Sequence, residues 1–149
     1  MDASDELYRE VVLDHYKSPR HHGKMDRPDA LEWGKNPLCG DELELYLGVK
    51  DGKISDIKFD GKGCSISQAS ASMMTEAVVG KGLSEVKEIV SDFKGMMMDG
   101  KPADQMPDAL EDAKSLEGVK KYPVRIKCAL LSWNTLLEAV KKLEARKAA

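Results

Sequence analysis

The spacing of apolar residues divides the chain into an early region of strands and a later region of helices. Residues 42–49 alternate strictly between polar and apolar side chains, which is typical of a strand with one buried face. The Asp51-Gly52 pair that follows predicts a tight hairpin. We therefore expect a return strand at about 53–60, and then a bend followed by a third short strand at 63–66.

Apolar residues that recur every three or four positions predict helices before and after this sheet. The expected helices cover residues 4–17, 67–79, 84–98 and 126–146, with a short helix at 108–116, and Ser84 is expected to cap the third of them. Residues 18–38 contain three prolines and two glycines, so we expect an irregular loop there, long enough to carry a function. Strands early in the chain and helices late predict an α+β fold.

Length and composition exclude several classes of protein. A length of 149 residues fits one domain, so residues 1–149 are expected to fold as a single unit. The 26 acidic residues outnumber the 23 basic ones, and this net charge of −3 argues against nucleic acid as the main partner. No run of about 18 apolar residues is present to span a membrane. The acidic N-terminus does not resemble a secretory signal, so we expect a cytoplasmic protein.

The chain contains three cysteines, and this odd number argues against a framework of disulfides. Cys39 precedes the first strand, and Asp41 lies two residues on, where an extended chain projects both side chains to the same side. Cys64 follows a glycine-rich turn, and Cys128 is expected in the first turn of the last helix, where the pKa of a thiol is lowered. All three thiols are expected outside the apolar stripes. The spacing alone only suggests a metal site, and burial as small core residues remains the alternative.

Other residues with possible metal chemistry are expected to have structural roles. His21 and His22 lie in a Pro/Gly-rich segment, which favours solvated surface over metal binding or partner docking. His15 is expected to pack in its helix or lie at the surface. The methionines at 73, 74 and 96–98 are expected in the core rather than on a metal. The acidic stretch at 104–112 is expected to be a solvated face.

Three segments around the cysteines together resemble a known family. Residues 36–41 (Asn-Pro-Leu-Cys-Gly-Asp), 61–67 (Gly-Lys-Gly-Cys-Ser-Ile-Ser) and 125–133 resemble the three motifs of the IscU/NifU N-terminal family of iron–sulfur cluster assembly proteins. The resemblance extends over essentially the whole chain. It is strongest to the SufU branch, because Lys127 stands where IscU and NifU-type members carry a histidine. A long stretch between the second and third cysteines, including residues 96–101, also resembles that branch.

The resemblance implies a fold, a ligand set and partners. The implied fold is an IscU-like α+β domain, with a three-stranded antiparallel sheet packed by about five helices. The implied metal ligands are Cys39, Asp41, Cys64 and Cys128, holding a tightly bound Zn²⁺, with a [2Fe–2S] cluster or iron as the alternative. The implied partners are a SufS-type cysteine desulfurase and downstream SUF scaffold or acceptor proteins.

The chemistry of these residues suits sulfur transfer. Three thiolates and one carboxylate suit a closed tetrahedral zinc site, and Arg125 and Lys127 are expected to offset part of the negative charge. Cys39 lies on a glycine-flanked loop, so it is the ligand expected to leave the metal and attack the persulfide of the desulfurase. The resemblance also assigns the persulfide to this first cysteine. Such a protein is a zinc-dependent acceptor of the sulfurtransferase type rather than a stand-alone enzyme.

Three other functions remain open at this point. The first is a scaffold on which an iron–sulfur cluster forms at the three cysteines, since such clusters are also held by thiolates. The second is a small redox enzyme with Cys39 as its reactive thiol, which would need a resolving cysteine but no metal. The third is a non-catalytic binding module that zinc merely stabilises, in which another metal ligand would replace Cys39 without loss of function.

Overall fold

The computed structural model describes residues 3–148, with side chains described for residues 8–146. An N-terminal helix precedes a sheet of three strands, and the remaining helices follow it. In chain order the described elements are α1 (Ala3–Lys17), β1 (Ala30–Asn36), β2 (Asp41–Lys50), β3 (Lys53–Lys62), α2 (Ser65–Val78), α3 (Leu83–Met98), the short 3₁₀ turn η1 (Ala103–Gln105), the 3₁₀ segment η2 (Asp108–Lys121) and α4 (Pro123–Ala148). The predicted α+β fold is confirmed.

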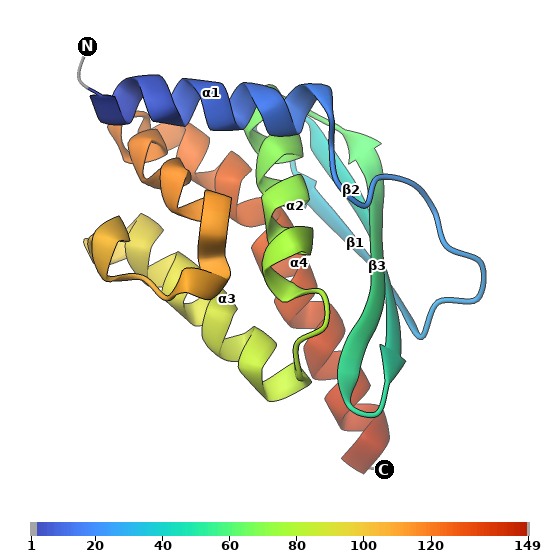
Figure 1. Ribbon diagram of the computed structural model, residues 1–149. Coiled ribbons are helices and arrows are strands. Elements are labelled where there is room, and N and C mark those ends of the chain that lie inside the picture. Colours follow the sequence, from blue (N-terminus) through green and yellow to red (C-terminus); the bar gives the residue numbers. More distant parts are fainter. Residues whose placement is uncertain (1–2, 149) are drawn as a thin grey trace.

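The strands form an antiparallel sheet in the order β1-β2-β3. The turn between β2 and β3 is the hairpin predicted at Asp51-Gly52, and a register shift separates Gly48 from Val49. Figure 1 shows the helices gathered on one face of the sheet, while the segment at 18–29 loops out on the other side. Part of this segment pairs with the free edge of β3, because the Gly23 N–H donates to the Phe59 carbonyl at 2.8 Å. The edge strand is thereby covered.

The third strand of the sheet lies elsewhere than the sequence predicts. A strand at 63–66 is wrong, because β3 continues to Lys62 and α2 begins at Ser65. The third strand is β1, within the stretch expected to be an irregular loop. Its large apolar side chains point outward, since Trp33 is 59% exposed, while alanine, glutamate, glycine and asparagine occupy the inward positions. A side chain on Gly34 would meet the Thr135 hydroxyl of α4 at 2.1 Å, so the strand and the helix approach closely.

Some helices also begin or end at other residues than the apolar pattern predicts. The N-cap of α3 is Gly82, without a side-chain hydrogen bond, so Ser84 does not cap this helix. The helix expected at 108–116 is the longer segment η2, interrupted at Glu111, whose φ is +46°. α4 begins at Pro123, three residues before the expected start. Proline suits the first helical position because its missing N–H would have no partner there.

The core lies between the sheet and the helices. Phe93 of α3 and Trp133 of α4 stack with ring centroids 4.0 Å apart. The Trp133 indole N–H donates to the Ser70 hydroxyl of α2 at 2.9 Å, so this contact also joins α2 to α4. The methionines at 73, 74, 96 and 97 are buried as predicted, whereas Met98 is 62% exposed. None of the helices between residues 3 and 148 is long and apolar enough to cross a membrane.

A fully buried histidine joins three helical elements. The His15 ring of α1 lies 2.7 Å from the Ser72 hydroxyl of α2 through Nδ1, and 2.8 Å from the Asp112 carboxylate of η2 through Nε2. The Glu76 carboxylate is 3.6 Å from the same Nε2. Asp112, expected on a solvated face, is half exposed yet binds this ring. A buried polar group that is fully partnered fixes how its elements pack.

We predict that His15→Ala lowers the free energy of unfolding by about 2–4 kcal/mol, because it leaves a cavity and removes one of the two long-range partners of the buried Ser72 hydroxyl. Chemical denaturation followed by circular dichroism measures this change. His22→Ala is the matched control, since the His22 side chain is 45% exposed. The control should cost less than about 1 kcal/mol. Equal costs for the two variants would contradict a structural role for His15.

Candidate metal centre

Three thiols and one carboxylate from separate elements converge at the end of the sheet opposite the β2–β3 hairpin. Cys39 lies on the turn between β1 and β2, and Asp41 is the first residue of β2. Cys64 is the N-cap of α2, and Cys128 lies in the second turn of α4. The structure thus brings together the four residues that the sequence predicts as ligands, over sequence separations of up to 89 residues.

The turn that carries Cys39 is tight and exposed. The Asn36 carbonyl accepts hydrogen bonds from the Cys39 N–H at 3.2 Å and the Gly40 N–H at 2.9 Å. Gly40 has a φ of +71°, a left-handed conformation that glycine adopts without steric cost. Asn36 and Asp41 face each other in the strand register, so only four residues separate the two strands. The turn therefore presents the Cys39 thiol to solvent while the strands below it stay paired.

The Cys128 thiol forms the buried side of the site. It is fully buried, and its Sγ lies 3.3 Å from the Cys39 Sγ. The Asn36 side-chain amide donates to the Cys128 Sγ at 3.8 Å. Sequence reasoning missed this role of Asn36, although the residue stands within the first motif. Its side chain therefore links the end of β1 to the start of α4.

Asp41 anchors the sheet to α2. Its side chain is 1% exposed, and its Oδ1 accepts a hydrogen bond from the Cys64 N–H at 2.9 Å. Its Oδ2 lies 3.9 Å from the Cys64 Sγ. The Ser67 N–H also approaches the Cys64 Sγ at 3.4 Å, as expected for a capping side chain. A side chain on Gly63 would lie 2.5 Å from the Asp41 Oδ1, so only glycine leaves room for this carboxylate.

The donor atoms have separations that suit one small metal ion. One donor atom each from Cys39, Asp41 and Cys128 lies within 4.8 Å of the other two. A tetrahedral ion about 2.3 Å from each sulfur needs sulfur atoms roughly 3.8 Å apart. The Cys39 and Cys128 sulfur atoms are 3.3 Å apart, about half an ångström closer than this value. Cys64 is outside this group of three, but its Sγ lies 3.9 Å from the Asp41 Oδ2. With Cys64 the site offers three thiols and one carboxylate, which is the chemistry that Zn²⁺ accepts.

The electrostatics of the thiols differ from the sequence prediction. Cys128 is in the second turn of α4 and inside the apolar core, not in the first turn beside charged residues. Burial, followed by hydrogen bonding with Cys39, raises the pKa of Cys128 far above its usual value, so the predicted lowering is wrong for this thiol. Attraction to Cys64 is the main cause that raises the pKa of Arg125, which places this guanidinium beside the site. Lys127 instead lines a groove with Lys35 and Lys94.

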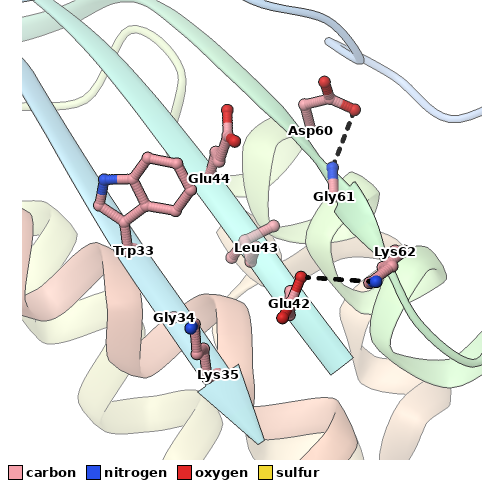
Figure 2. A pocket seen from close by; sticks show the side chains of 9 residues that line it. All are labelled: Trp33, Gly34, Lys35, Glu42, Leu43, Glu44, Asp60, Gly61 and Lys62. Atoms are coloured by element: carbon pink, nitrogen blue, oxygen red, sulfur yellow. Dashed lines mark hydrogen bonds and ion pairs between the residues drawn. The ribbon is translucent and has the colours of Figure 1, made fainter. Parts of the chain in front are cut away.

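The histidines and the outer face of the sheet do not contribute to this group. His21 Nδ1 lies 2.9 Å from the Thr75 hydroxyl, and His22 lies near Asp60. Neither is in the donor groups formed by the described residues. A separate hollow of about 460 Å³ lies on the outer face, where Figure 2 shows Trp33 beside Glu44 and Asp60 on the next strand. No cysteine lines this hollow.

Residues 7–149 match the model of the NifU-like N-terminal domain family. The chain belongs to this family. It is 45% identical over 140 residues to the zinc-dependent sulfurtransferase SufU of Bacillus subtilis, with 94% of this chain and 93% of that protein covered. It is 42% identical over 137 residues to the iron–sulfur cluster assembly scaffold protein IscU of Thermotoga maritima, with 92% and 94% covered.

A solved structure supports the same placement. The structure described as an iron–sulfur cluster assembly scaffold protein for the SUF system, from Fervidobacterium islandicum, matches with a TM-score of 0.82 at 40% identity. The match covers 93% of this chain and 99% of that one. The resemblance inferred from the three cysteine motifs is therefore confirmed. This NifU-like N-terminal domain is of the IscU/SufU type, and its relatives carry both names.

We predict that the three thiols of the metal-free domain react with iodoacetamide in the order Cys39, Cys64, Cys128. Cys39 is exposed, whereas Cys128 is fully buried and its raised pKa keeps it protonated at pH values where an ordinary thiol ionises. Timed alkylation followed by peptide mass spectrometry should find Cys128 at least about tenfold slower than Cys39. In denaturant the three rates should converge. A Cys128 rate equal to that of Cys39 in the folded protein would contradict this geometry.

We predict that Gly63→Ala weakens Zn²⁺ binding about tenfold or more, because the new methyl group displaces the Asp41 carboxylate. Competition against a chromophoric chelator measures the affinity. Gly82→Ala is the matched control, because the nearest atom to its new methyl group is 3.8 Å away. The control should bind Zn²⁺ as the unmodified domain does. Unchanged affinity in Gly63→Ala would show that the Asp41 carboxylate is not a ligand.

Proposed function

We propose that this IscU/SufU-type domain is an iron–sulfur cluster assembly protein of the SUF system that accepts persulfide sulfur from a cysteine desulfurase on Cys39. The observation that carries the proposal is the position of Cys39. It is the exposed thiol of the site, on a tight turn, with a buried thiol 3.3 Å behind it. A partner's persulfide can approach this sulfur from solvent without unfolding a helix or strand.

The residues that would hold Zn²⁺ are Cys39, Asp41, Cys64 and Cys128. The name of the Bacillus subtilis relative, a zinc-dependent sulfurtransferase, supports zinc as the ion. When bound, the ion keeps its thiol ligands deprotonated at neutral pH, even where burial favours the protonated form. Arg125 beside Cys64 would offset part of the negative charge of the thiolates.

The transfer step is a thiol exchange at the terminal sulfur of the donor persulfide. The Cys39 thiolate attacks that sulfur and forms a new S–S bond, while the S–S bond of the donor breaks. The electron pair of the broken bond stays on the desulfurase cysteine, which leaves as a thiolate. Cys39 then carries the persulfide, and no outside oxidant or reductant is consumed. The proposed donor is a desulfurase of the SufS type, and the proposed acceptors are downstream SUF scaffold or acceptor proteins.

The reaction needs thiols that stay reduced. Cys39, Cys64 and Cys128 are all free, as expected for a chain that works in a reducing compartment such as the cytoplasm. Cys64, the thiol of intermediate exposure, remains near the carboxylate rather than paired in a disulfide. The proposal therefore places the protein in the cytoplasm.

A second candidate function is that of a scaffold on which an iron–sulfur cluster is assembled. Two observations favour it. The relatives from Thermotoga maritima and Fervidobacterium islandicum are named as scaffold proteins. Three thiols in one site also supply most of the ligands that a [2Fe–2S] cluster takes. Anaerobic purification without added metal separates the two, since a carrier holds about one zinc and a scaffold holds iron and labile sulfide.

We predict that Cys39→Ala abolishes the stimulation of desulfurase turnover, because no exposed thiolate is left to accept sulfur. Incubation of the unmodified protein with a cysteine desulfurase and free cysteine should add one sulfur atom to Cys39, seen by alkylation-trapping mass spectrometry. Circular dichroism should show that the variant keeps its fold, since Cys39 lies on an exposed turn. Persulfide found only on Cys64 or Cys128, or full stimulation by the variant, would overturn the proposal.

A further inference from the structure

A groove of about 400 Å³ beside the metal centre is lined by three lysines and by no acidic side chain. Lys35 comes from β1, Lys94 from α3 and Lys127 from α4. Asn36 lines the groove as well, and its amide also donates to the Cys128 Sγ. The lysine groove, defined by these three lysines, is therefore continuous with the cysteine site.

The three lysines have no ion-pair partner among the residues that the structure describes. Lys35 stands opposite Glu42 in the strand register. Figure 2 shows that Glu42 instead pairs with Lys62 on the other neighbouring strand, at 3.8 Å. Lysines elsewhere on the same two helices do pair, because Lys87 binds Glu144 at 3.0 Å and Lys142 binds Glu32 at 2.6 Å. Three cations without an ion pair therefore lie together at the groove.

The rest of the lining suits a polypeptide better than a small ion. Met98 is 62% exposed and borders the groove together with Leu131 and Asn134. Flexible methionine side chains adapt to partner surfaces. On the turn next to Asn36, Leu38 is 73% exposed. This lining offers an acidic segment of a protein both apolar contacts and complementary charge.

We propose that the lysine groove docks an acidic segment of the cysteine desulfurase that delivers sulfur to Cys39. This inference rests on the proposed function, since it names the chemistry of the surface that the sulfur donor presents. Positive charge next to the reacting thiol accelerates the encounter with a negative partner and orients it. The remaining surface of an acidic chain repels such a segment, so the groove also fixes which end of the molecule the donor approaches.

The test replaces both accessible lysines away from the metal ligands, as Lys35→Glu with Lys94→Glu, and leaves Lys127 because it adjoins Cys128. The concentration of the domain that gives half-maximal stimulation of the desulfurase should rise about tenfold at low salt, with maximal stimulation unchanged. High salt should reduce the difference from the unmodified domain. Lys35→Arg with Lys94→Arg should behave as the unmodified domain, because it keeps the charges.

Lys50→Glu with Lys53→Glu is the matched control, since both lysines are exposed, lie at the hairpin end of the sheet, and change the net charge by the same amount as the double variant. A control that weakens docking as much as the double variant would overturn the proposal, because the effect would then follow net charge alone. An unchanged half-maximal concentration in the double variant would also overturn it. A third contrary result is binding of inorganic phosphate to the lysines, seen by nuclear magnetic resonance, together with no response of these lysines to the desulfurase.

The same experiments separate this inference from the proposed function. If sulfur reaches Cys39 equally well in the double variant, the lysine groove plays no part and the proposed function stands. If the unmodified domain acquires no sulfur on Cys39, the proposed function fails. Titration calorimetry with the desulfurase still measures docking in that case. A salt-dependent affinity that is lost in the double variant would then support docking at the lysine groove, independently of sulfur transfer.

Discussion

The buried carboxylate of Asp41 is the group on which the geometry of the cysteine site depends. A carboxylate that is 1% exposed is costly unless it is hydrogen-bonded, and the Cys64 N–H at the start of α2 supplies that bond. The N-terminus of a helix also favours negative charge. This hydrogen bond joins Asp41, the first residue of β2, to Cys64, the residue that precedes α2. The space it requires explains why Gly63 carries no side chain.

Two thiols of the site are held by helices, and the third is exposed on a turn. Cys128 lies on the buried side of α4, the helix whose Trp133 packs against Phe93 and binds Ser70. Cys64 is held by the cap of α2. Cys39, by contrast, depends only on a four-residue turn between paired strands. Movement of this turn breaks few contacts, whereas movement of either other thiol displaces a helix. The Cys39 thiol can therefore move while the other donor atoms stay in place.

The sequence predicts the parts of this structure in which large apolar side chains point inward. β2, β3 and the main helices follow such patterns, and their existence is predicted correctly. β1 escaped prediction because alanine, glutamate, glycine and asparagine occupy its inward positions instead of large apolar residues, while Trp33 points to solvent. The glycine allows α4 to approach closely. The environment of Cys128 was also misjudged, since the start of α4 at Pro123 moves this residue into the core.

The ligands were predicted from the motifs around the cysteines, because the spacing of the cysteines alone was not decisive. The residues that surround these side chains are seen only in the tertiary structure. The last residues of β1 show why. Asn36 reaches the buried thiol, whereas Lys35, one position earlier, lines both the lysine groove and the outer hollow of the sheet. The turn that follows places Cys39 above them. The end of β1 therefore connects the exposed Cys39 thiol with the positively charged groove beside it.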